Sequence, residues 1–124
     1  MSRPSHRLQS LRLAFGDATC LSVMRRWLRT TIGDHDTLFT AELVCTELVT
    51  NAIEHGGGAG SVRIFVTDEE RVHVEVDDRN PSVLLTVGSS RLGPHRGHGL
   101  QMIDSVAEWG ILGNASGKTV WAAF

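Results

Sequence analysis

The strongest constraint on the fold is a pair of short segments in which valine or isoleucine alternates with other residues. The alternating apolar residues are, in order, Val62, Ile64, Val66, Val72, Val74 and Val76. A turn at Asp68–Glu70 joins the two segments, so they read as a β-hairpin. Alternation with a period of two places all six side chains on one face. That face must be buried against another layer, which requires helices on one side of the sheet.

The segments before the hairpin supply a strand and two helices. We expect an opening strand at 8–15, a helix from an Asp17 cap to about Thr31, and a longer helix ended by glycines at 56–58. The longer helix starts at Asp34 or Asp36 and runs through His55. Its apolar stripe consists of Leu38, Ala41, Cys45, Leu48 and Ala52, broadened by Val44, Val49 and Ile53. The face of the first helix consists of Cys20, Val23, Met24, Trp27 and Leu28.

The segments after the hairpin complete the sheet. An irregular loop at 81–96 is followed by a short helix from about Gly99 to Val106 and a closing strand pair at 108–112 and 119–124. Trp27, Trp109 and Trp121 are expected in the core. The predicted fold class is α+β: a two-layer sandwich with helices on one face of a mainly antiparallel sheet, as a single domain over residues 1–124.

Composition excludes several classes of protein. With 41% hydrophobic and 21% charged residues, the chain is neither disordered nor of low complexity. A net charge of −2 argues against direct nucleic-acid binding. The longest uncharged run, at 80–90, is far shorter than the roughly 20 apolar residues of a membrane span, so no membrane segment is expected. Cys20 and Cys45 are expected to be buried free thiols, which fits a reducing, cytoplasmic location.

A polar stripe on the longer helix is not explained by the core. Glu47, Asn51 and His55 recur at every fourth residue and therefore stack on one face. A solvated face is one interpretation. Asparagine is a mediocre helix former, however, and a carboxylate one turn from an amide offers hard oxygen ligands for Mg²⁺.

Two further segments have both an ordinary and a functional interpretation. Asp78 lies at the end of a strand, where it either begins a plain turn or accepts a hydrogen bond from a ligand. Gly97 and Gly99 lie just before a helix, where small residues allow free N–H groups to approach phosphate oxygens, although this spacing is also common in ordinary turns.

The segment at 113–119 looks like a phosphate-binding loop but does not meet its requirements. It has three residues between its glycines where four are needed, and only five residues follow Thr119. No helix can follow to receive the phosphates. We interpret the segment as a hairpin turn.

Taken together and in order, four segments resemble the GHKL (Bergerat-fold) ATPase superfamily, over nearly the whole chain. Glu47–His55 is similar to its N box, Asp78–Ser82 to its adenine-binding box, Gly97–Leu100 to its glycine box, and Gly117–Val120 to its last box. The anti-sigma-factor serine kinases, and in particular the short regulatory ATP-binding proteins of actinobacteria, are the most similar group.

The resemblance implies ATP and Mg²⁺ as ligands and a role for each matching residue. Glu47 would be the catalytic base that activates a hydroxyl nucleophile, and Asn51 would bind Mg²⁺ at the phosphates. Asp78 would accept a hydrogen bond from the adenine amino group, with Thr119 assisting at the base.

For the phosphates, the resemblance implies that Gly97 and Gly99 bring backbone N–H groups close, beside a mobile lid at about 82–96. Arg91 and Arg96 lie within that lid, but neither can be assigned a phosphate contact from the sequence.

The implied function is an ATP-dependent protein serine/threonine kinase that acts as an anti-sigma factor and so regulates transcription. Its partners would be an anti-sigma-factor antagonist of the STAS type and a sigma factor, and a homodimer is suggested. The alternative is a catalytically inactive ATP-binding module that sequesters a regulatory partner. An ATP hydrolase or a detached sensor-kinase domain is a third interpretation.

Overall fold

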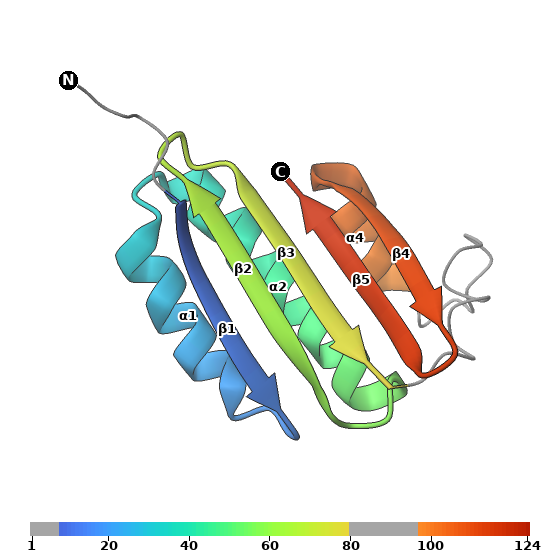
Figure 1. The fold of residues 1–124 in the computed structure, drawn as a ribbon. Coiled ribbons are helices and arrows are strands. Elements are labelled where there is room, and N and C mark those ends of the chain that lie inside the picture. Colours follow the sequence, from blue (N-terminus) through green and yellow to red (C-terminus); the bar gives the residue numbers. More distant parts are fainter. Residues whose placement is uncertain (1–7, 80–96) are drawn as a thin grey trace.

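The computed structural model describes residues 8–79 and 97–124, which form one sheet with three helices on one of its faces (Figure 1). The expected α+β architecture is confirmed. The strands are β1 (Leu8–Phe15), β2 (Gly60–Thr67), β3 (Val72–Asp78), β4 (Glu108–Asn114) and β5 (Gly117–Ala123). The helices are α1 (Cys20–Thr31), α2 (His35–His55) and α4 (Gly97–Val106). The loop predicted at 81–96, and with it the lid, lies outside the described residues.

The sheet has the strand order β1-β2-β3-β5-β4, and each described pair of neighbours is antiparallel. The β2–β3 hairpin forms with Val62 opposite Val76 and Ile64 opposite Val74. All six alternating side chains of this hairpin are buried under the helices. The expected one-sided burial is therefore confirmed.

The first helix differs from the prediction at its start and on its face. Asp17 is not the cap: its Oδ1 accepts hydrogen bonds from the Thr19 N–H at 2.9 Å and the Thr19 hydroxyl at 2.6 Å. It closes a turn ahead of the helix, and Thr19 occupies the cap position. The buried face of α1 consists of Cys20, Met24 and Leu28 and is narrower than the apolar face predicted from the sequence. Val23 lies outside the buried face and is 46% exposed.

The second helix has the predicted limits. Asp34 is its N-cap and accepts a hydrogen bond from the Thr37 N–H at 2.9 Å, and Gly56 ends it. A second acid supports the same helix end from the β2–β3 turn. The Glu70 carboxylate accepts from the Gly33 N–H at 2.7 Å and from the Asp34 N–H at 3.0 Å. Glu70 adopts a φ of 59°, so the contact is made from a backbone conformation that is unfavourable for a side-chain-bearing residue.

The closing elements are longer than predicted. α4 begins at Gly97, and β4 and β5 extend to a tight turn at Ala115–Ser116. The segment that looks like a phosphate loop is thus a hairpin turn, as expected. Cys20 and Cys45 are buried free thiols, also as expected. Trp121 does not lie in the core: it lies on the open face of the sheet, the face away from the helices, stacked at 6.0 Å on the His73 ring.

Candidate functional site

Two of the predicted site residues, Asp78 and Thr119, lie at one end of the sheet, where α2 and β3 finish and β5 begins (Figure 1). The Arg79 N–H donates to the Gly56 carbonyl at 3.2 Å and so joins the two C-terminal ends. A Cβ added to Gly56 would lie 2.5 Å from Asp78 Oδ2, and one added to Gly117 would lie 2.0 Å from the Asp78 carbonyl oxygen. Only glycine allows this closeness, so both glycines are needed to fit the backbone around Asp78.

Asp78 has a cationic partner that the sequence motifs did not indicate. The Lys118 ammonium donates to Asp78 Oδ2, and the two residues lie opposite each other in the β3–β5 register. The lysine and aspartate side chains are only 4% and 3% exposed. Lys118 is the only lysine of the chain, whose other eleven basic residues are arginines. Its being the only lysine was the one sequence signal that could have pointed to Lys118 as a site residue.

Asp78 and Thr119 line a common cavity of about 370 Å³ at the β3 end. The residues that line it are Asp77, Asp78, Arg79, Ser116, Gly117, Lys118 and Thr119. Thr119 is placed beside Asp77 in the sheet, and its hydroxyl donates to Asp77 Oδ1 at 2.5 Å. The structure therefore places Asp78 and Thr119 at the same cavity, with their side chains on opposite faces of the sheet.

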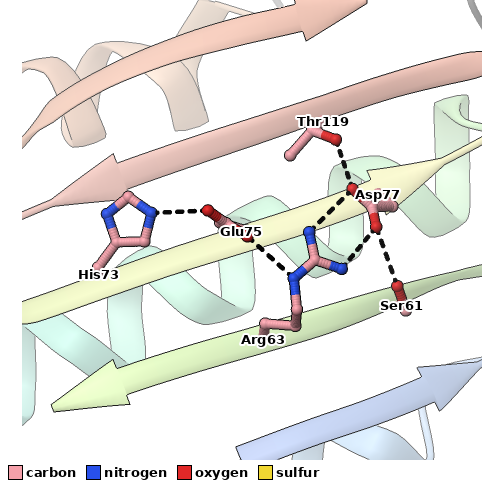
Figure 2. Close-up of polar contacts among 6 residues, drawn as sticks. All are labelled: Ser61, Arg63, His73, Glu75, Asp77 and Thr119. Carbon is pink, nitrogen blue, oxygen red and sulfur yellow. Dashed lines mark hydrogen bonds and ion pairs between the residues drawn. The ribbon is translucent and has the colours of Figure 1, made fainter. Parts of the chain in front are cut away.

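Asp77 belongs to a chain of charged groups on the open face (Figure 2). Arg63 lies between two carboxylates: its Nη1 is 2.7 Å from Asp77 Oδ2 and its Nε is 2.9 Å from Glu75 Oε1. The Ser61 hydroxyl also donates to Asp77, and the His73 ring lies 3.0 Å from Glu75. This series of side-chain contacts links β2, β3 and β5 on the open face.

These contacts set the charge states of the two acids. Burial raises the pKa of Asp77, but hydrogen bonds from Arg63 and Thr119 outweigh it and leave the pKa below its ordinary value. The hydrogen bond with His73, together with those from Arg63, lowers the pKa of Glu75 against burial. Arg63 is correspondingly held as a cation, with its pKa raised by the hydrogen bond to Asp77.

Glu47 and Asn51 are half-buried on the flank of α2 away from α1. The α1 flank is used by contacts between Arg29 and Glu42 at 3.0 Å and between Arg25 and Thr46 at 3.5 Å. Neither the Glu47 side chain nor the Asn51 side chain has a hydrogen bond to any residue in the described ranges 8–79 and 97–124. At 1.5 Å per residue, Asn51 lies about 8 Å and Glu47 about 14 Å along the axis from Gly56. The amide is thus nearer to Asp78 than the carboxylate is.

Gly97 and Gly99 form the first turn of α4. α4 contacts both α2 and β4, and it ends one residue before β4 begins. It therefore runs back along β4, and its N-terminus points to the end of the sheet that holds Asp78 and Gly117 (Figure 1). A helix N-terminus directed to this end offers free N–H groups and a partial positive charge to an anion.

The donor set suits a magnesium ion that is bound mainly through a nucleotide. Within the described part of the chain, no group of three or more histidine, cysteine, aspartate or glutamate residues could hold a metal. Asn51 offers one amide oxygen that no described residue hydrogen-bonds, and Mg²⁺ typically takes one or two protein ligands together with phosphates and water. Across the same described residues, no helix is long and apolar enough to cross a membrane.

Comparison with known proteins agrees with this architecture. The family model for the histidine kinase-like ATPase domain matches residues 17–124. No curated protein sequence matches. The crystal structure of the RsbU and RsbW domains of Rv1364c from Mycobacterium tuberculosis is similar in fold, with a TM-score of 0.62 and 21% identity over 93% of this chain. The present chain spans 32% of that one. By the extent of the family match, the chain belongs to the histidine kinase-like ATPase domain family.

Proposed function

We propose that the protein is an ATP-dependent protein serine/threonine kinase that acts as an anti-sigma factor in the cytoplasm. The observation that carries the proposal is the convergence of Asp78, Asn51 and the N-terminus of α4 on one end of the sheet, in a chain of an ATPase family. We place this function in one domain spanning 1–124. Its protein substrate would be an antagonist of the STAS type, its second partner a sigma factor, and its assembly a homodimer.

Each residue would have a separate task. The Asp78 carboxylate would accept a hydrogen bond from the adenine amino group, and the N–H groups of the first turn of α4, at Gly97 and Gly99, would meet the phosphates. Thr119, in the same cavity, would assist at the base. Asn51 would hold Mg²⁺, which when bound supplies charge neutralisation at the phosphates.

Glu47 would accept the proton of the attacking serine hydroxyl. The bond from that oxygen to the terminal phosphorus forms, the bond from phosphorus to the bridging oxygen breaks, and ADP leaves with the electron pair. Phosphoryl transfer needs chiefly positioning and electrostatic stabilisation, which a small site of this kind can provide. The half-buried position of Glu47, without a hydrogen bond to another described residue, leaves its oxygens available to a substrate.

A binding module that transfers no phosphate is the second candidate function. The surroundings of Glu47 favour it. A catalytic base is usually oriented by a third group. No described residue orients Glu47 by a hydrogen bond, so nucleotide could serve only to organise a partner-binding surface.

Phosphotransfer to a recovered partner distinguishes these candidates. Proteins that co-purify with the chain from its native host would be incubated with it, Mg²⁺ and ATP labelled at the terminal phosphate. The kinase proposal predicts label on a serine or threonine of a small partner. If the chain binds ATP and no recovered partner is labelled, the kinase proposal is overturned and the binding-module function remains.

A further inference from the structure

We propose that Lys118 is the positioning residue that makes this site select adenine over guanine nucleotides. The proposal rests on the proposed function, because it concerns the site in which Asp78 meets the base. It assigns a role to a residue that the sequence motifs leave without one. The role is to hold the Asp78 carboxylate in place and in its charged form.

The geometry supplies a rigid ion pair at the cavity wall. Lys118 Nζ donates to Asp78 Oδ2 with both side chains almost fully buried. Both residues line the cavity of about 370 Å³. Gly56 and Gly117 pack against the same aspartate so closely that neither could carry a Cβ. The Gly56 backbone and the Lys118 ammonium therefore confine the carboxylate, while Gly117 packs against the backbone carbonyl of the same residue.

The charge state of the Asp78 carboxylate decides which nucleobase it can hydrogen-bond. A buried aspartate without a cation would take up a proton or bind water, and a protonated carboxyl can donate as well as accept. In this ion pair the carboxylate accepts from the ammonium, and an ionised carboxylate can only accept. A carboxylate has about four acceptor positions, so the bond from Lys118 still leaves it able to accept from a ligand.

Adenine and guanine differ at the ring position that the Asp78 carboxylate would contact. Adenine carries an amino group that donates, whereas guanine carries a carbonyl oxygen that accepts. An obligate acceptor pairs with the first and repels the second. Loss of Lys118 should relax this discrimination, because the carboxyl could then donate to the guanine carbonyl.

A purely structural role for Lys118 makes a different prediction. A lysine that only stabilises the fold would, when replaced, weaken ATP and GTP binding by the same factor. The ratio of the two dissociation constants separates these roles, since it is insensitive to a general loss of folded protein. Leu28→Ala, which opens the core under α1 away from the cavity, is a control for destabilisation alone.

The experiment is calorimetric titration of Mg-ATP and Mg-GTP into the wild-type chain, Lys118→Met, Lys118→Arg and Leu28→Ala. The wild type should prefer ATP by about 10- to 100-fold, the range expected for a hydrogen bond to a charged group. Lys118→Met should lose most of this preference, Lys118→Arg should keep part of it, and Leu28→Ala should keep all of it. If Lys118→Met does not fold, Lys118→Gln, which keeps a hydrogen-bond donor and removes the charge, replaces it, with the same expected loss.

The outcomes separate the two proposals. An unchanged ATP preference in Lys118→Met, or in Lys118→Gln where that variant replaces it, overturns the role of Lys118 and leaves ATP binding intact. A wild type that binds ATP and GTP equally also overturns it, together with the assignment of Asp78 to the base. A wild type that binds neither nucleotide overturns the proposed function and this inference with it.

Discussion

Lys118 and Asp78 form an ion pair in which both side chains are almost fully buried. Removing one partner of a buried pair leaves an uncompensated charge, which typically costs about 3–5 kcal/mol of unfolding free energy. Lys118→Met should lower the free energy of unfolding in urea by about that amount. The double variant Asp78→Asn/Lys118→Met should lose less. Arg29→Met, which breaks the surface pair with Glu42, should cost less than about 1 kcal/mol.

Equal losses for Lys118→Met and Arg29→Met would contradict the buried pair. So would a double variant that is less stable than Lys118→Met alone.

Because Lys118 is the only lysine of the chain, its burial can be measured chemically. An amine-acylating reagent should modify the α-amino group of the folded protein and leave Lys118 largely unmodified. Adding urea to unfold the chain should expose the lysine and yield a second acylation, which intact mass spectrometry followed by peptide mapping would detect. Rapid acylation of Lys118 under native conditions would show that the ammonium is accessible and would contradict the pairing.

The elements with local signals were predictable, and the contacts between distant segments were not. Asp34 and Gly56 set the limits of α2, and strict alternation set the β2–β3 hairpin, because both signals are complete within a few residues. Asp17 gave a misleading cap signal, since an aspartate before a helix can equally close a turn onto the next residues.

The candidate site shows the same division. Its motif residues could be named from the sequence, but the meeting of Asp78 and Thr119 follows from the pairing of β3 with β5, which no local pattern encodes. The Lys118–Asp78 pair links residues 40 positions apart, and it depends on the β3–β5 register. Trp121 was expected in the core, but the same register puts it on the open face, beside His73.

Glu70 supports the N-terminus of α2 from another part of the chain. Its carboxylate accepts two backbone hydrogen bonds there, from Gly33 and Asp34, at an end where N–H groups lack partners within the helix. Glu70→Ala should therefore destabilise the protein by about 1–2 kcal/mol in urea unfolding. Glu69→Ala, in the same turn, should change stability by less than about 0.5 kcal/mol. If the two variants were equally stable, Glu70 would not act as a cap.

The open-face acids predict a loss of stability in acid. The pKa values of Asp77 and Glu75 are both lowered in the folded state, so these acids bind protons less readily when folded. Their stabilisation is present above the ordinary carboxyl range, about pH 4, and is lost as the pH falls through the folded values. Arg63→Met should cost on the order of 1 kcal/mol at pH 7, since the groups are partly exposed, and less at pH 2.

Urea unfolding at pH 7, 5, 3 and 2 would measure this difference. Arg12→Met serves as the control, because Arg12 lies opposite Arg63 in the sheet and is exposed. Its effect should not depend on pH. A difference between wild type and Arg63→Met that stays constant from pH 7 to pH 2 would contradict the assigned charge contacts.

Asn51 and Glu47 should separate nucleotide binding from catalysis. Asn51→Ala should weaken Mg²⁺-dependent ATP binding and phosphotransfer together, because the amide is the proposed protein ligand of the metal. Calorimetric titration with ATP, with and without Mg²⁺, would measure the effect. An affinity for Mg-ATP that is the same in Asn51→Ala and the wild type would contradict the assignment.

The most direct test of the kinase is the rate of phosphotransfer by Glu47→Gln, measured beside its affinity for ATP. The substitution removes the base and keeps the shape of the side chain, so affinity should stay within about twofold while the rate falls by about 10²- to 10⁴-fold. Glu54→Gln, on the exposed side of the same helix, should leave both unchanged. A Glu47→Gln variant that phosphorylates the recovered partner at the wild-type rate would contradict the account.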